Sequence, residues 1–378
     1  MKFKYFYTFF LIVGLITSSK AQNEKAEADF KSVMDKYSAV GASVAIVKDG
    51  QIIYNHSFGL KDLDKKLPLT NSDIFRIASI SKSFSATAIM QLVEAGTISL
   101  DDEFGDLVGF KIRNPKFPDQ KITLKMALSH TSGLNDSQGY LNFDVLNPDK
   151  NPNWAKCYND YAPGSKFDYC NLNFNLIGAI IEQKSGERFD NYIKNHILKP
   201  LGLYGGYCVD SLDSTRFVNL YEYHDDTKTY TLASSAYAPR RTEIANYVMG
   251  YSTPVFSPTG GMKISAHDLA KYMIMHMNYG TSNGVKIMRK KSAEKMQMAL
   301  TADEGYGLAI RTADQLIQGV KLKGHTGSAY GLHSTMFFNP KEKFGFVIIA
   351  NGINATYTDG LPDFSRAAIN SLYQSFIK

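Results

Sequence analysis

The hydrophobic pattern predicts β-strands at both ends of the chain. Near the start, Ala42–Lys48 and Gln51–Asn55 are short runs of strand-forming residues, and the pair Asp49-Gly50 between them is typical of a tight hairpin turn. Toward the end, similar runs return at residues 306–311, 320–324, 334–339 and 344–349. Because neighbouring strands with short connections indicate antiparallel pairing, we expect one antiparallel sheet.

Between these ends the spacing of apolar residues is helical. Helices are expected at Leu124–Ser129, Leu172–Glu182 and Arg188–Ile197, and a last one at Asp363–Phe376. We therefore expect an α/β (α+β) fold, in which an antiparallel sheet is flanked by helices and interrupted by an inserted, mostly helical domain. The sheet domain would comprise residues 22–78 and about 256–378, and the insert about 79–255. The polar loop 135–160 is either a wall of the site or a surface excursion.

The first 21 residues have the pattern of a signal peptide. Lys2 and Lys4 precede an apolar stretch, and Ser19-Lys20-Ala21 has small residues where a signal peptidase requires them. We expect cleavage after Ala21 and an exported protein, periplasmic or secreted, with no stable membrane span; an uncleaved anchor is the alternative.

Composition narrows the function classes. The chain has 378 residues, 44% of them hydrophobic, and a net charge of +6, which falls by three if the leader with its lysines is removed. This modest, evenly spread charge argues against nucleic acid as a partner. No histidine or cysteine spacing suits a metal, so no metal or cofactor is expected. The three cysteines, Cys157, Cys170 and Cys208, allow at most one disulfide bridge within the chain, so we expect no essential disulfide. The sequence leaves the oligomeric state open.

The chemical signal lies in Ser79 and Lys82, a Ser-x-x-Lys pattern that precedes an apolar helical run. Residues three apart share one face of a helix, so the lysine amine reaches the serine hydroxyl. It could accept the proton if burial and the helix N-terminus lowered its pKa. The backbone N–H of Ser79 could meanwhile face an oxyanion. Ser292 and Lys295 repeat the spacing among basic residues, and we interpret them as surface.

Two further motifs follow. Tyr-x-Asn occurs at Tyr140 and at Tyr169, and we favour Tyr169 with Asn171 because this copy leads directly into a helix. A buried phenol near a lysine can relay protons, and an amide can orient both lysine and substrate. The third motif comprises His325, Thr326, Gly327 and Ser328 on a predicted strand, where glycine allows close approach. Taken singly, each motif also fits ordinary packing or a strand end.

Together the motifs resemble the serine β-lactamase and penicillin-binding-protein superfamily, specifically its class C-like branch. The resemblance extends from about Val40 to the C-terminus. It includes Leu128–Leu134, Pro163-Gly164, the start of the helix at Asn171 and Gly260-Gly261. The resemblance implies a β-lactamase/transpeptidase-like fold and a small-molecule or peptide substrate.

The resemblance also implies roles for the residues. Ser79 would be the nucleophile, Lys82 and Tyr169 would share the acid and base work, and Asn171 would orient lysine and substrate. The backbone N–H groups of Ser79 and Ser328 would form the oxyanion hole, with Thr326 and Gly327 beside them on the strand. Turnover would pass through an acyl-enzyme.

One departure concerns His325, which stands where β-lactam and peptidoglycan specialists of the family usually carry lysine. Histidine is mostly neutral at pH 7, so a substrate carboxylate loses a permanent partner. We hypothesise that Lys323, two residues earlier on the same strand face, restores positive charge to the cleft; a solvated edge lysine is the alternative. Cys170 replaces a frequent serine and is expected to be a buried residue without chemistry, and His130 is expected to fix its loop.

Three functions remain open. The leading hypothesis is an exported serine hydrolase that cleaves an ester or amide, possibly a peptide. The second is a true class C-like β-lactamase or D-Ala-D-Ala carboxypeptidase. The third, of another class, is a catalytically silent penicillin- or peptide-binding module; retention of Ser79, Lys82, Tyr169 and Asn171 argues against it.

Overall fold

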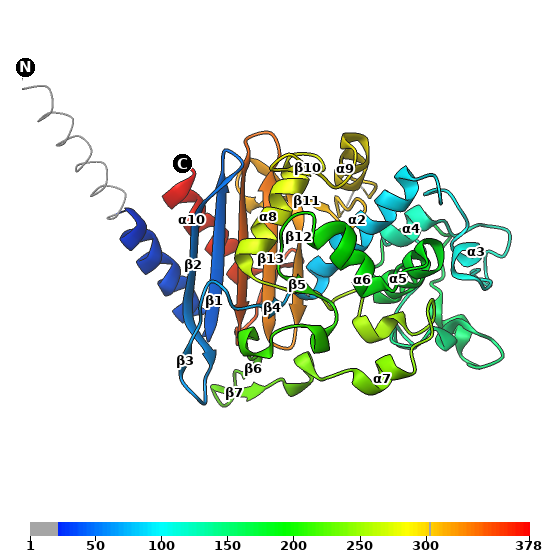
Figure 1. The fold of residues 1–378 in the computed structure, drawn as a ribbon, viewed down its shortest axis with the longest axis horizontal. Coiled ribbons are helices and arrows are strands. Elements are labelled where there is room, and N and C mark those ends of the chain that lie inside the picture. Colours follow the sequence, from blue (N-terminus) through cyan, green and yellow to red (C-terminus); the bar gives the residue numbers. More distant parts are fainter. Residues whose placement is uncertain (1–21, 302–303) are drawn as a thin grey trace, which may run out of the picture.

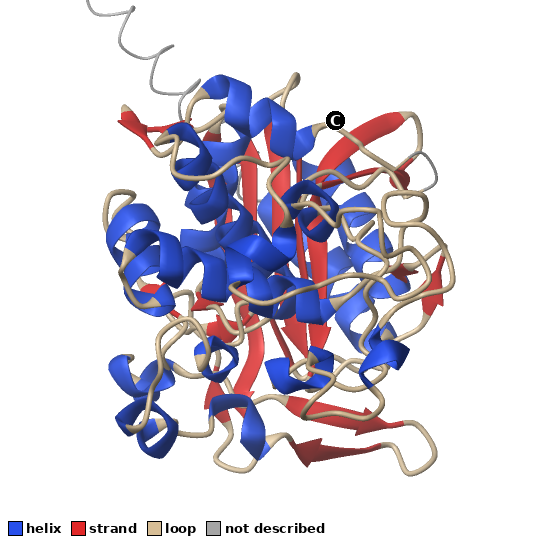
Figure 2. Cartoon of the chain, turned by 90° about the vertical axis from the view of Figure 1, so that its right-hand side faces the viewer, coloured by secondary structure: helices blue, strands red, loops and turns tan. Residues whose placement is uncertain are grey.

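The computed structural model describes residues 22–301 and 304–378, so the predicted leader, residues 1–21, lies outside the described residues. A large antiparallel sheet runs through the centre of the molecule, with helices on both faces (Figures 1 and 2). Its seven strands follow the order β11-β12-β13-β14-β1-β2-β3. The bounds are β1 Gly41–Lys48, β2 Gln51–Asp62, β3 Leu67–Pro68, β11 Arg311–Ile317, β12 Val320–Ala329, β13 Leu332–Asn339 and β14 Phe344–Asn351.

The two ends of the chain therefore share one sheet. The register pairs Val44 of β1 with Ile348 of β14, which joins segments about 300 residues apart in sequence. The predicted hairpin between β1 and β2 is confirmed, and both of its turn residues, Asp49 (φ 53°) and Gly50 (φ 72°), are left-handed. Such a turn matches the right-handed twist of the flanking strands.

Both faces of the sheet are covered, which explains why β1 and β14 are buried almost throughout. Side chains alternate between the faces of a strand. Ala42, Val44 and Ile46 pack against the helical residues 22–36 and α10 (Asp363–Phe376). These two segments are the blue and red helices on the left of Figure 1. Ala45 and Val47 face the opposite core, toward α8 (Ala266–Met277).

Helices of the middle of the chain pack beyond α8 and form the right-hand part of the molecule in Figure 1. α2 (Ser81–Glu94) packs against α5 (Asn171–Ser185), and most residues of both helices are buried. The other labelled α-helices are α3 Phe104–Val108, α4 Leu124–Leu128, α6 Phe189–Ile193, α7 Arg241–Ala245 and α9 Lys290–Gln297. Minor strands are β4 Phe75–Arg76, β5 Gly205–Gly206, β6 Tyr221–His224, β7 Thr229–Leu232, β8 Lys263–Ile264, β9 Thr281–Ser282, β10 Val285–Lys286, β15 Tyr357–Thr358 and β16 Leu361–Pro362.

The predicted fold class, an antiparallel sheet with a helical insertion, is thus confirmed, and the last helix has its predicted bounds. The strand predicted at 306–311 is wrong. Gly305 and Ala309 adopt positive φ angles of 58° and 59°, so this segment turns, and Tyr306 bridges to Arg311 across the turn. The strand begins only at Arg311. Within the described residues no helix is long and apolar enough to cross a bilayer.

Candidate active site

Ser79 lies in a short 3-10 turn, Ala78–Ile80, that leads into α2. Ala78 has a φ of 46°, an uncommon conformation for a residue with a side chain, and it turns the chain sharply before the serine. The turn is held from the sheet, because the Ser334 hydroxyl of β13 donates to the Ile77 carbonyl oxygen at 2.7 Å. The nucleophile candidate is therefore fixed where the sheet meets the helical part.

Lys82 is completely buried on the first turn of α2 and points back toward Ser79. Its Nζ donates to Ser79 Oγ at 3.2 Å, to Asn171 Oδ1 at 2.8 Å and to the Thr259 carbonyl oxygen at 2.9 Å. Burial lowers the pKa of Lys82 to about 7, although Asp136 opposes this effect. A large fraction of the lysine is therefore neutral near pH 7 and able to accept a proton.

Tyr169 lies on the other side of the same amine. Lys82 Nζ is 4.7 Å from the centre of its ring. Burial raises the pKa of Tyr169, although the nearby Ser79 hydroxyl acts in the opposite direction, so the phenol keeps its proton at neutral pH. The hydroxyl is buried and has no direct hydrogen bond to any described residue. It is thus free to serve an incoming group.

Asn171, the first residue of α5, connects the tyrosine segment to the lysine. Its Oδ1 accepts from Lys82 Nζ and also from Thr259 Oγ1, the latter at 2.7 Å. The competing motif at Tyr140 differs: Asn142 accepts the Asp144 N–H and caps a 3-10 turn. Of the two Tyr-x-Asn copies, the structure brings Tyr169 and Asn171 to Ser79 and Lys82.

The strand β12 closes the site opposite α2. A Cβ atom at Gly327 would lie 2.4 Å from the Ile77 carbonyl oxygen and 2.9 Å from Ser79 N, so only glycine lets the strand approach the nucleophile. Thr326 and Ser328 flank it on the same strand and line the cavity at Ser79. This proximity suits an oxyanion hole formed by the N–H groups of Ser79 and Ser328.

His325 is buried and bound at both ring nitrogens. Nδ1 lies 2.5 Å from the Thr326 carbonyl oxygen, so it must be the donor, and Nε2 accepts from the Tyr306 hydroxyl at 2.8 Å. Burial lowers the pKa of His325 to about 3. The imidazole is therefore neutral and supplies no cation at this position.

His130 organises the tyrosine segment. Its backbone is left-handed (φ 57°), its carbonyl oxygen accepts the Asp168 N–H at 2.8 Å, and its Nδ1 accepts the Cys170 N–H at 3.1 Å. Its ring also packs 4.2 Å from the Tyr169 ring. Cys170 is buried, and burial raises the pKa of its thiol, which suits a packing residue. All three cysteines are unpaired.

Arg311 was missed by the sequence reasoning. It lines a cavity of about 240 Å³ that also contains Ser79, Tyr169, His325, Thr326, Gly327 and Ser328. Its guanidinium is mostly buried and pairs with Glu304 at 3.4 Å, while its Nε is buried without a partner among the described residues. Arg311 belongs to no motif in the sequence. It reaches the site only through the pairing of β11 with β12, which places it beside Gly324.

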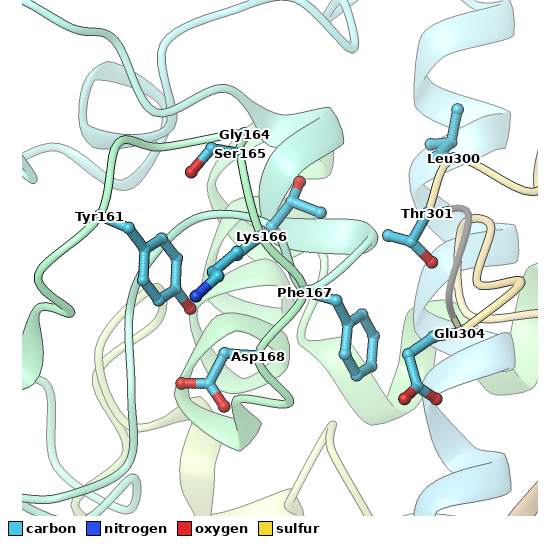
Figure 3. Close-up of a pocket in the computed structure, with 10 residues that line it drawn as sticks. Tyr161, Gly164, Ser165, Lys166, Phe167, Asp168, Leu300, Thr301 and Glu304 are labelled. Carbon is cyan, nitrogen blue, oxygen red and sulfur yellow. The ribbon is translucent and has the colours of Figure 1, made fainter.

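A second cavity of about 580 Å³ adjoins the first, and both are lined by Phe167 and Glu304. Figure 3 shows this cavity, with Tyr161, Lys166 and Asp168 on one wall and Leu300 and Thr301 on the other. Phe167 is two residues before Tyr169, so the second cavity opens on the tyrosine side of the nucleophile.

Two interpretations from the sequence are wrong. The Lys323 amine donates to the Gln297 carbonyl oxygen at 2.8 Å and to Thr312 Oγ1 at 2.7 Å, so it is bound outside the cleft. Ser292 is buried rather than at the surface, because it lies on the inner face of α9.

Residues 26–359 match the Beta-lactamase family, so the chain belongs to this family of serine hydrolases. Protein flp of Staphylococcus aureus (strain N315) is 26% identical over 349 residues, which cover 87% of this chain and 63% of the relative. The chain thus spans less than two thirds of that relative's length.

Two solved structures have the same fold. The octameric penicillin-binding protein homologue from Pyrococcus abyssi is 28% identical, with a TM-score of 0.73 and coverage of 93% of this chain and 76% of that one. The class C beta lactamase from Rhodobacter sphaeroides is 19% identical, with a TM-score of 0.71 and coverage of 94% and 99%. The predicted superfamily is confirmed.

Proposed function

We propose that the protein is an exported serine hydrolase that cleaves an ester or amide, including a peptide, through an acyl-enzyme on Ser79. The observation that carries the proposal is the buried Lys82 amine, 3.2 Å from Ser79 Oγ, whose pKa burial lowers to about 7. A binding module has no use for such an amine, because burying a lysine costs stability. Export is supported by the leader pattern of residues 1–21.

The proposed reaction begins when neutral Lys82 takes the proton of Ser79 Oγ as the oxygen attacks the substrate carbonyl. The N–H groups of Ser79 and Ser328 donate hydrogen bonds to the developing oxyanion. The Tyr169 phenol passes a proton to the leaving alcohol or amine and regains one from the protonated Lys82. Water then attacks the ester on Ser79 while the same groups take its proton. This proton passes to Ser79 Oγ as the bond between Oγ and the acyl carbon breaks, and the acid product leaves.

Arg311 favours substrates that carry a carboxylate. His325 is neutral and Lys323 is bound elsewhere, so the guanidinium of Arg311 is the cation among the described residues that line the Ser79 cavity, where a substrate carboxylate would compete with Glu304 for it. An arginine fork pairs well with a carboxylate. This observation keeps a β-lactam or a peptide with a free C-terminus as the second candidate substrate class.

The leaving group would depart through the second cavity. Tyr169, the proposed proton donor to this group, faces the Ser79 cavity, and Phe167 connects that cavity with the one of about 580 Å³. A leaving group larger than one residue would therefore contact Tyr161 and Phe167.

The test exposes the purified protein without residues 1–21, and its Ser79→Ala variant, to a fluorescent penicillin and to p-nitrophenyl butyrate. Adduct mass and product release are followed together. Ser79-dependent ester turnover with little penicillin adduct supports the leading proposal. Ser79-dependent penicillin acylation supports the second class, and the hydrolysis rate of the adduct then distinguishes a β-lactamase from a peptidase. Silence with both substrates contradicts the proposed activity and favours a binding module.

A further inference from the structure

Asp136 lies in the loop after α4, next to the start of α5, and its carboxylate meets four donors. Oδ2 accepts from the Asn171 backbone N–H at 2.8 Å and from Asn171 Nδ2 at 2.9 Å. Oδ1 accepts from the Leu172 N–H at 2.9 Å and from Cys170 Sγ at 3.4 Å. The carboxylate thus caps the first turn of α5 and at the same time binds the side chain that contacts Lys82.

This contact determines which way the Asn171 amide points. A carboxylate only accepts hydrogen bonds, so the NH₂ group of Asn171 must face Asp136. Oδ1 then faces Lys82 Nζ at 2.8 Å and Thr259 Oγ1 at 2.7 Å, both of which donate to it. In the reversed orientation the amide oxygen would face the carboxylate and the NH₂ group would face the lysine, so both contacts would repel.

Among the described residues, the groups around Lys82 leave Asp136 as its counter-charge. Burial lowers the pKa of His130 and of His325 and raises those of Tyr169 and Cys170, so these four groups are neutral near pH 7. The remaining contacts of the amine are the Ser79 hydroxyl, the Asn171 amide, the Thr259 carbonyl and the ring of Phe174.

We propose that Asp136 is a positioning residue for catalysis, which orients the Asn171 amide toward Lys82 and whose charge determines how readily that lysine releases its proton. The proposal rests on the proposed function, since Lys82 matters as the base for Ser79. Its electrostatic part is measurable without turnover.

The test follows the protonation of Lys82 by NMR of protein with ¹³Cε-labelled lysine, and the signal is assigned by its loss in Lys82→Met. In Asp136→Asn, the titration midpoint of Lys82 should fall by about one pH unit, because a nearby opposite charge is lost. The low-pH limb of kcat/KM for p-nitrophenyl butyrate should move with it. At the wild-type optimum the rate should fall about tenfold or more, because Asn171 is no longer held in one orientation.

The double variant Asp136→Asn with Asn171→Asp exchanges the amide and the carboxylate. It should reverse the downward shift of the Lys82 titration midpoint that is expected for Asp136→Asn alone. The carboxylate then contacts Lys82 directly, and the new amide donates to it, so the midpoint should return to the wild-type value or rise above it. If Asp136→Asn does not fold, Asp136→Ser removes the charge but keeps an acceptor for the helix N–H groups, and it should show the same downward shift.

Ser265→Ala is the matched control for a lost helix cap. Ser265 accepts the Asp268 N–H at 3.1 Å at the start of α8 and is not among the hydrogen-bond partners of Lys82, so the variant should lose stability but keep the Lys82 midpoint. An unchanged midpoint in Asp136→Asn, with a stability loss like that of Ser265→Ala, would reduce Asp136 to a structural cap and overturn the proposal. If the midpoint shifts but wild type hydrolyses nothing, the proposed function fails and the electrostatic role stands.

Discussion

At the scale of single residues, we expect Arg311 rather than Lys323 to pair with a substrate carboxylate, and a pair of alanine variants tests this expectation. In Arg311→Ala, kcat/KM for an ester that bears a free carboxylate should fall about 10- to 100-fold, because one hydrogen-bonded charge pair is lost. The methyl ester of the same substrate should be hydrolysed at nearly the wild-type rate. Lys323→Ala is the control and should leave both substrates unaffected, since its amine is bound to Gln297 and Thr312. Equal losses on both esters would show that Arg311 only supports the fold.

The pH dependence of acylation also belongs to individual residues. Burial lowers the pKa of Lys82 to about 7 and that of His325 to about 3. The fall of kcat/KM on the acid side of its pH profile, its low-pH limb, should therefore come from Lys82. Below this value the amine is protonated, and kcat/KM should fall about tenfold per pH unit. His325→Gln should leave the limb in place, whatever it does to the maximal rate. A limb that moves or vanishes in this variant would assign the titration to the histidine.

At the scale of elements, the distance between β12 and the 3-10 turn of Ser79 depends on Gly327. In Gly327→Ala, the new Cβ would meet the Ile77 carbonyl oxygen at 2.4 Å, so strand and turn must separate. A displacement near 1 Å at a catalytic group costs about 100-fold in rate, so we expect an acylation loss of this order, measured as penicillin adduct or ester turnover. Gly206→Ala, whose Cβ would meet only Leu212 at 3.8 Å, is the control. Normal acylation in Gly327→Ala would contradict a tight oxyanion hole.

Local signals in the sequence predicted those elements whose interacting residues are close to one another in sequence. The hairpin after Lys48 and the helix Asp363–Phe376 follow from turn chemistry and apolar spacing, and Ser79 and Lys82 meet because they are one turn apart. Arg311 and Asp136 were not predicted, because strand pairing and the start of α5 bring them to the site from distant segments. The prediction of a strand at 306–311 is wrong because Gly305 and Ala309 adopt left-handed backbone conformations, which the β-forming composition of the segment does not reveal.

For the molecule as a whole, the site is built at the expense of stability, and Lys82 makes this cost dependent on pH. In the unfolded chain a lysine keeps its ordinary pKa near 10.4, whereas burial lowers that of Lys82 to about 7 in the folded protein. Between these values the unfolded state binds more protons, so the free energy of unfolding rises with pH, by about 1.4 kcal/mol per unit from this group. The penalty of burying the lysine is complete below pH 7 and disappears toward pH 10.

Lys82→Met isolates this contribution, because His130 and His325, whose pKa values the charge of Lys82 also lowers, are kept neutral by burial from pH 7 to 10 in both proteins. The difference in the free energy of unfolding, wild type minus variant, measured by urea denaturation from pH 7 to 10, should increase with pH at about that slope. The variant should also lose acylation, which links the stability cost to the function of the amine. Parallel stability curves would mean that the lysine stays protonated in the folded state across this range, and then it could not be the base for Ser79.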